Sequence, residues 1–170
     1  MIMKGHRLFK PFLGLVVALG AAALIFSLTR ISPHELDWRF FFLFIGMAAV
    51  ASRLSIPIPH VKGEVTVGDT LIFLTMLLYD GEAAVLMAAV DGLSSSLHVS
   101  KKLRVCLFNS AQMSGSTLLT VWTLRLCFGA IPNLSHAGYS SRIVGAVCVM
   151  TLVQYVTNSG LVATYTAPAS

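Results

Sequence analysis

The polar residues between Asp91 and His98 have types and a spacing that suit chemistry, although the surrounding segment VLMAAVDGLSSSLHV is apolar. Asp91, Ser95 and His98 follow one another at spacings of four and three, so in a helix they share one face. If the segment crosses a membrane, a carboxylate there costs at least about 2.5–3.5 kcal/mol and is expected to be protonated, paired or in contact with water. Asp91 therefore has two open interpretations. It belongs to a ligand, ion or proton-sensitive site, or it is a structural acid hydrogen-bonded to Asn109, Gln112 or a serine.

Two later segments carry amide side chains at helical spacing. Asn109 and Gln112 are three residues apart, and Gln154 and Asn158 are four apart. Amides hydrogen-bond between helices in lipid, so they are explained by helix packing alone. The alternative is that the amides and the Asp91 face together line one ligand-binding pocket.

Small residues recur every four positions in two of these segments, and such stripes let helix backbones approach closely in a membrane. The stripes consist of Ala84, Ala88, Gly92 and Ser96 in one segment and of Ala111 and Gly115 in another. We expect both to be packing faces. Faces of this kind also permit a homodimer.

Catalytic and metal-binding motifs are missing from the sequence. It contains no HExxH, no GxSxG and no phosphate-binding glycine loop, and its histidines are scattered. Cys106, Cys127 and Cys148 are isolated, with no CxxC pair. The sequence predicts no catalysis, no metal and no cofactor in this stretch.

The composition predicts an integral membrane protein whose main partner is the lipid bilayer. Of 170 residues, 56% are hydrophobic and 11% are charged, whereas a soluble domain is about 25% charged. The net charge of +5 comes without a basic run interleaved with aromatics, so we expect no nucleic-acid partner.

The elements that must position these residues are six apolar segments, because about 20 helical residues span the hydrocarbon of a bilayer. They are Pro11–Leu28, Trp38–Ser52, Thr66–Tyr79, Glu82–Val99, Cys106–Phe128 and Arg142–Thr166. The first, fourth, fifth and sixth are long enough to cross, and the second and third are short. Between these two, SIPIPH excludes helix and favours an extended chain, and Asp69 is expected to cap the helix that follows. The predicted fold is an all-α polytopic membrane bundle over residues 11–166. A basic cytoplasmic N-terminus occupies residues 1–10 and a cytoplasmic tail residues 167–170.

The basic residues orient this bundle. With the N-terminus inside, eight of the twelve Lys and Arg residues are cytoplasmic, and the opposite orientation would place those eight outside. They are Lys4, Arg7, Lys10, Arg53, Lys62, Lys101, Lys102 and Arg104. We expect both termini in the cytoplasm of a multi-pass inner-membrane protein, with Arg125 reaching water at the opposite face.

One stretch resembles a known group of proteins. IPIPHVKGEVTVGDTLIFLTMLL, followed by LFN at Leu107–Asn109 and NSGLVA at Asn158–Ala163, resembles the N-terminal membrane regions of bacterial signalling proteins with a cytoplasmic GGDEF or HD-type output domain. The resemblance covers about Arg53 to Ala163. It implies a sensory or scaffolding membrane module, with an output domain as its partner. The sequence given has no output-domain motif before TAPAS, so we expect a fragment or a stand-alone module.

Two alternatives remain. Compact substrate-binding membrane subunits of vitamin transporters also have about six helices with short central spans and mid-membrane polar groups. A coupling subunit would then be the partner. The other alternative is a membrane scaffold whose polar residues only hold helices together.

Overall fold

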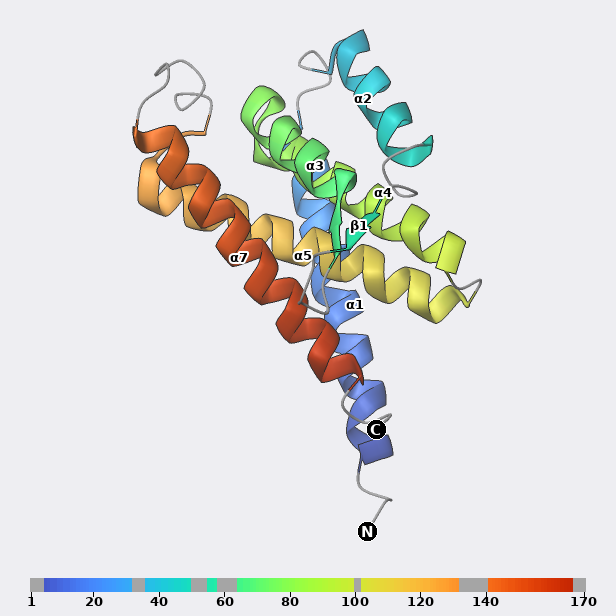
Figure 1. Ribbon diagram of the computed structural model, residues 1–170. Coiled ribbons are helices and arrows are strands. Elements are labelled where there is room, and N and C mark those ends of the chain that lie inside the picture. The colour runs from blue at the N-terminus through green and yellow to red at the C-terminus, as the bar shows by residue number, and fades with distance from the viewer. Residues whose placement is uncertain are drawn as a thin grey trace.

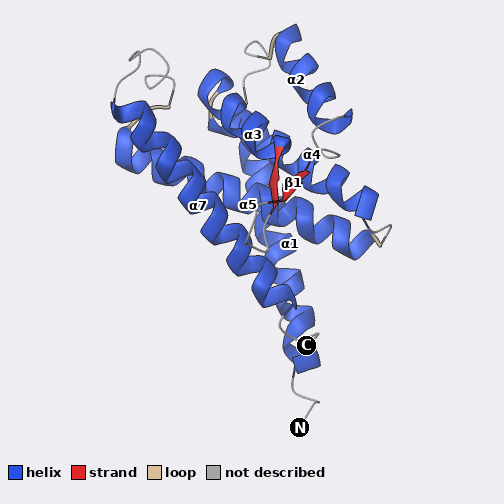
Figure 2. Ribbon diagram, in the orientation of Figure 1, coloured by secondary structure: helices blue, strands red, loops and turns tan. Residues whose placement is uncertain are grey.

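The computed structural model describes residues 5–31, 36–49, 55–57, 64–99, 102–131 and 141–166. These form six helices and a small hairpin (Figures 1 and 2). The elements are α1 (Gly5–Arg30), α2 (Trp38–Ala49), β1 (Ser55–Pro57), β2 (Glu64–Thr66), α3 (Val67–Tyr79), α4 (Gly81–Val99), α5 (Leu103–Phe128) and α7 (Ser141–Thr166). The predicted helical class is confirmed, with each helix within a few residues of a predicted segment. α1 begins at Gly5, within the stretch expected to be the basic N-terminus, and the part of it able to cross a membrane begins at Pro11 as predicted. The predicted tail 167–170 lies outside the described residues.

A small hairpin of two three-residue strands accompanies the helices. β1 and β2 pair antiparallel, with Ile56 opposite Val65 and Pro57 opposite Glu64. The extended chain expected from the prolines of SIPIPH is confirmed for Ser55–Pro57, because proline cannot continue a helix and restricts the residue before it. β2 leads directly into α3.

α4 is the buried centre of the bundle and packs against α1, α2, α3 and α5. Its small stripe faces these neighbours: Ala84 and Ala88 are fully buried, and Ser96 is 1% exposed. A Cβ added to Gly92 would lie 2.6 Å from the carbonyl oxygen of Asn109 on α5, so no side chain fits there. The absence of a side chain at Gly92 thus allows α4 and α5 to pack backbone to backbone.

Two of the described helices are long and apolar enough to cross a membrane, namely α1 over Pro11–Arg30 and α7 over Ser141–Leu161. Only 22% and 17% of their apolar windows is buried. A core helix of a soluble protein would be mostly buried, so these two helices present apolar side chains outward. We also expected α4 and α5 to cross the membrane. Their serines, threonines and amides lower the mean hydropathy of these helices, and neither is among the two described helices that are long and apolar enough.

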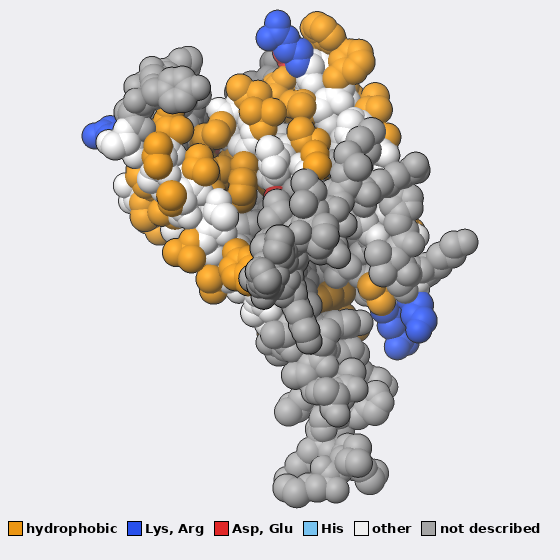
Figure 3. Space-filling model, in the orientation of Figure 1, with side chains coloured by type: hydrophobic (Ala, Val, Ile, Leu, Met, Phe, Trp, Pro, Cys, Tyr) orange, Lys and Arg blue, Asp and Glu red, His pale blue; other side chains and the backbone are white. Residues whose placement is uncertain are grey.

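The outer surface of the bundle is rich in exposed hydrophobic side chains. Among them are Leu19 on α1, Phe42 on α2 and Leu152 on α7, each at least 60% exposed. Figure 3 shows hydrophobic side chains over much of the described surface, with Lys and Arg side chains at its margins.

Figure 1 shows where several helix ends lie. The start of α1 and the end of α7 lie toward the lower part of the view, and the end of α4 and the start of α5 lie at its right, near mid-height. The start of α2, the turn between α3 and α4 and the start of α7 lie toward the upper part.

Candidate functional site

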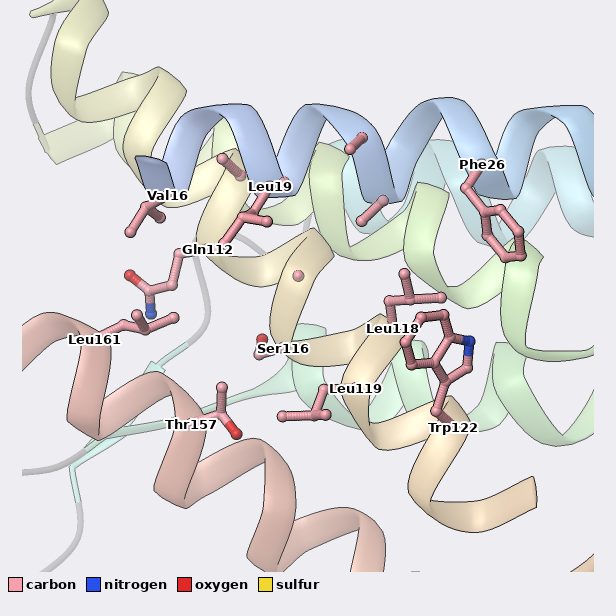
Figure 4. A pocket seen from close by; sticks show the side chains of 15 residues that line it. Val16, Leu19, Phe26, Gln112, Ser116, Leu118, Leu119, Trp122, Thr157 and Leu161 are labelled. Atoms are coloured by element: carbon pink, nitrogen blue, oxygen red, sulfur yellow. The ribbon is translucent and has the colours of Figure 1, made fainter. Parts of the chain in front are cut away.

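A groove of about 520 Å³ lies between α1, α5 and α7 (Figure 4). It opens where α1 and α5 separate. At Gly20 the two helices touch, since an added Cβ would overlap Ala111. At Gly115, one turn further along α5, no described atom lies within 4 Å of an added Cβ. Further along the groove Phe26 packs edge-on against Trp122, with ring centroids 6.4 Å apart.

The lining of this groove is apolar except for a few groups from α5 and α7. Leucines, alanines and Val16 form most of its wall, and none of its described lining residues carries a charge. Four of its described lining side chains can form hydrogen bonds, namely Gln112, Ser116, Thr157 and the indole of Trp122. The hydroxyl of Ser116 donates to the carbonyl oxygen of Met113 at 3.1 Å.

Gln112 is the most distinctive polar group of the groove. It is only 5% exposed. Its Nε2 donates to the backbone oxygen and to Oδ1 of Asn158 on α7, each at 3.4 Å. Its Oε1 is buried and has no hydrogen-bond partner among the described residues. Both facing atoms of Asn158 are acceptors, so the amino end of Gln112 must point toward them and the oxygen away. Figure 4 shows this oxygen on the side of Val16 and the nitrogen on the side of Leu161.

Gln154, the other buried amide of the α5–α7 contact, has a hydrogen-bond partner for its oxygen and for its nitrogen. Its Oε1 accepts a hydrogen bond from Thr120 at 3.1 Å, and its Nε2 donates to Thr117 at 3.3 Å. Asn158 donates in turn to the sulfur of Met113 at 3.4 Å. Gln154 therefore matches the packing interpretation, whereas Gln112 has an acceptor left over.

Asn109 belongs to a different contact, between α4 and α5. Its Nδ2 donates to Ser96 at 2.7 Å, and Ser96 donates to the backbone oxygen of Gly92 at 2.6 Å. Ser95, which directly precedes Ser96 in α4, is half-buried. His98 lies in α4, but its side chain is outside the part of the chain described.

Asp91 lies against α3 rather than against the amides of α5. It is 3% exposed, and a Cβ on Gly68 would lie 2.5 Å from its Oδ1, so the carboxylate fills the place of a side chain at Gly68. Asp69 is close enough to repel it electrostatically. The Oδ1 of Asp91 has no hydrogen-bond partner among the described residues. The sequence-predicted site residues are thus distributed over three places instead of one pocket.

Sequence reasoning missed an ion-pair cluster at the end of α5. Arg125 donates to both carboxylate oxygens of Glu82 at 2.8 and 2.6 Å and to Asp80 at 3.1 Å. Its side chain is 33% exposed, so the expectation that it reaches water is only partly right. In the predicted topology the turn between the segments Thr66–Tyr79 and Glu82–Val99 lies on the same face as the end of Cys106–Phe128, and that was the available signal. Asp80 adopts φ 82° in the turn before α4, and its Oδ1 accepts the N–H of Gly81 at 2.6 Å.

The groove itself was also missed, although Gly115 was singled out for packing. Its walls come from α1 and α7, which are far apart in the sequence, so no local pattern brings them together. Within the described residues, no group of three or more His, Cys, Asp or Glu side chains could hold a metal ion.

Comparisons of the chain with protein-family models, with curated proteins and with solved structures found no match. What the chain displays by itself is a small helical bundle with two helices able to cross a membrane and an apolar groove with one buried, open acceptor.

Proposed function

We propose that this chain is the membrane-embedded sensory module of a signalling protein and that the groove between α1, α5 and α7 receives its signal. The groove carries the proposal. It has the volume and the mostly apolar lining, with few polar groups, that are typical of small-molecule sites. The proposed module performs no chemistry on what it binds.

A multi-pass inner-membrane location is part of the proposal. The outward apolar faces of α1 and α7 support contact with lipid. α4 and α5 cross in the interior, where neighbouring helices cover their polar groups, which is the usual place for such groups in a membrane bundle. The start of α1 and the end of α7 lie at the same end of the view in Figure 1, which supports the expectation that both are on the cytoplasmic side.

The signal would pass through α7. This helix forms one wall of the groove through Thr157 and Leu161. Its contact with α5 includes the 3.4 Å bonds between Gln112 and Asn158, which are long for hydrogen bonds. A ligand that binds better to a wider groove would therefore shift α7 away from α5 at a small cost in free energy. A ligand can drive a response only if it binds one of these two positions of α7 more tightly than the other. In the signalling proteins that the sequence resembles, an output domain follows the membrane part.

A groove-filling substitution tests this function. Leucine at Gly115 would enter the groove, since no described atom is within 4 Å of its Cβ. Gly14→Leu is a matched control on exposed α1 surface outside the groove. The chain is joined after Ser170 to a diguanylate cyclase domain, and cyclase activity is measured in membranes. We expect Gly115→Leu to change the activity and Gly14→Leu to leave it unchanged. Equal activities in all three proteins would refute sensing through the groove.

The transporter alternative is favoured by a different observation, the buried Asp91 beside the start of the short helix α3. Extended backbone followed by a short helix is a common feature of transporter binding sites, and β2 precedes α3 directly. Asp91→Asn should then abolish uptake of a small solute into cells. Genes for ATPases and a coupling membrane protein beside this one would favour transport. A reading frame continuing past codon 170 into a GGDEF or HD domain would favour signalling.

A further inference from the structure

The chemistry of the groove restricts what it can bind. Gln112 is 95% buried, since 5% of it is exposed. Its amino end is used by Asn158, and its Oε1 lacks a partner among the described residues. A buried acceptor without a hydrogen bond is unfavourable by about 1–3 kcal/mol. The missing partner must be a donor, because a carbonyl oxygen can only accept.

The apolar surroundings of Gln112 limit the sources of a donor. Its partner Asn158 and the neighbouring Leu161 lie in the last turn of Ser141–Leu161, the stretch of α7 able to cross a membrane. In a bilayer this places the amide inside one end of the hydrocarbon. The acyl chains that lie beside it carry no O–H or N–H.

The rest of the groove excludes charged ligands. None of the described residues that line it is charged, so a carboxylate or an ammonium group would be buried without a counter-charge. The walls beside Gln112 are Val16, Leu19 and Leu161, which suit hydrocarbon.

We infer that the groove binds a neutral, elongated apolar molecule carrying one hydroxyl or amide N–H group, which donates to Oε1 of Gln112. This inference rests on the proposed function and names its ligand class. An ordinary phospholipid chain would fill the same volume but leave the acceptor open.

Photoaffinity labelling of the full chain in lipid nanodiscs tests the inference. The two probes are a long-chain alcohol with a diazirine in its chain and the methyl ether of the same alcohol, which lacks only the donor. Labelled peptides from α1, α5 and α7 are quantified by mass spectrometry. One hydrogen bond gives about two- to tenfold in occupancy. We expect that preference for the alcohol over the ether in the wild type.

Two substitutions separate the ligand from the fold. Gln112→Leu should label equally with both probes, whereas Gln154→Leu, which alters the bonded amide of the same helix contact, should keep the preference. Gly115→Leu should abolish labelling of the groove by either probe. Equal labelling of wild type by alcohol and ether would show a groove for lipid chains and overturn the inference. Wild type that neither probe labels in the groove would also overturn the inference, because the groove would then not admit such a ligand.

The labelling and cyclase experiments together distinguish a failure of the inferred ligand class from a failure of the proposed sensory function. If Gly115→Leu changes cyclase output but the alcohol is not preferred, sensing stands and the ligand class falls. If the alcohol is preferred but cyclase output does not respond to Gly115→Leu, the ligand class stands and sensing falls.

Discussion

Gln112 on α5 donates its amide N–H groups to the backbone oxygen and to Oδ1 of Asn158 on α7, both at 3.4 Å. Eight residues further along α5, Thr120 donates to Gln154 at 3.1 Å. The same two helices are thus joined by one amide whose oxygen lacks a partner among the described residues and by one amide whose oxygen and nitrogen both have partners. Gln112, the first of these, lines the groove, and Gln154 does not.

Gln154→Leu should destabilise the protein more than Gln112→Leu. Leucine at position 154 leaves Thr117 without its bond from the amide and leaves Thr120 with only the backbone oxygen of Ser116 as an acceptor. Interhelical hydrogen bonds in membranes contribute about 0.6 kcal/mol each and up to about 1.7 kcal/mol. Leucine at position 112 removes two long bonds but also removes a buried acceptor that lacks a partner among the described residues. Unfolding in detergent, followed by circular dichroism, measures both. A larger loss for Gln112→Leu would contradict the two bonding patterns.

Gly92→Ala should weaken the contact between α4 and α5. Its Cβ would lie 2.6 Å from the carbonyl oxygen of Asn109, and a backbone atom cannot move aside as a side chain tip can. Forcing an extra methyl into a packed interior costs about 1–3 kcal/mol. The matched control is Gly14→Ala, at an exposed position of α1, where alanine is favoured in a helix. If the two substitutions shift the thermal midpoint in the same direction, the close approach of α4 and α5 is not real.

The pair of Arg125 and Glu82 should show strong coupling in a double-mutant cycle. Arg125→Leu leaves two carboxylates facing each other, with Glu82 only 12% exposed. Glu82→Gln removes one of them, so the double variant should recover part of the stability lost in Arg125→Leu. Close charged pairs couple by about 0.5–3 kcal/mol, and the two-pronged geometry predicts the upper part of that range. Additive effects in the cycle, measured by unfolding in detergent, would mean that the ion pair contributes nothing.

The helices could be predicted from the sequence because their signals are local. Runs of apolar residues and the prolines of SIPIPH each act within a few residues. The small stripe at Ala84, Ala88 and Gly92 identified the buried face of α4, since only small residues permit such close approach. These inferences need no knowledge of which helix lies beside which.

The site could not be predicted in the same way, because it depends on helix neighbours. One of the two interpretations left open by the sequence put Gln112 and Asp91 in one pocket, yet the rotation of α4 places Asp91 against Gly68 of α3. The groove depends on α1 meeting α5 at Gly20 and leaving it near Gly115. Nothing in either segment alone encodes that divergence.

The loop before α2 should lose a stabilising contact at low pH. Asp37 caps α2 by accepting the N–H of Phe40 at 3.1 Å and ties the loop to α3 by accepting the hydroxyl of Tyr79 at 2.7 Å. The hydrogen bond from Tyr79, together with the cap and the charge of Arg39, holds the pKa of Asp37 below its ordinary value. A carboxyl with a lowered pKa stabilises the fold at pH values above its unfolded pKa, about 3.9. That stability disappears as the pH falls through the lowered value.

Thermal unfolding of wild type and Asp37→Asn between pH 7 and pH 2.5, followed by the fluorescence of the adjacent Trp38, measures this dependence. We expect wild type to be the more stable at pH 7 and the difference to vanish at the acidic end. Tyr79→Phe, which removes only the donor, should bring the pKa of Asp37 closer to its ordinary value and move the loss to higher pH. A difference between wild type and Asp37→Asn that stays constant down to pH 2.5 would show that the charge of Asp37 does not stabilise this junction.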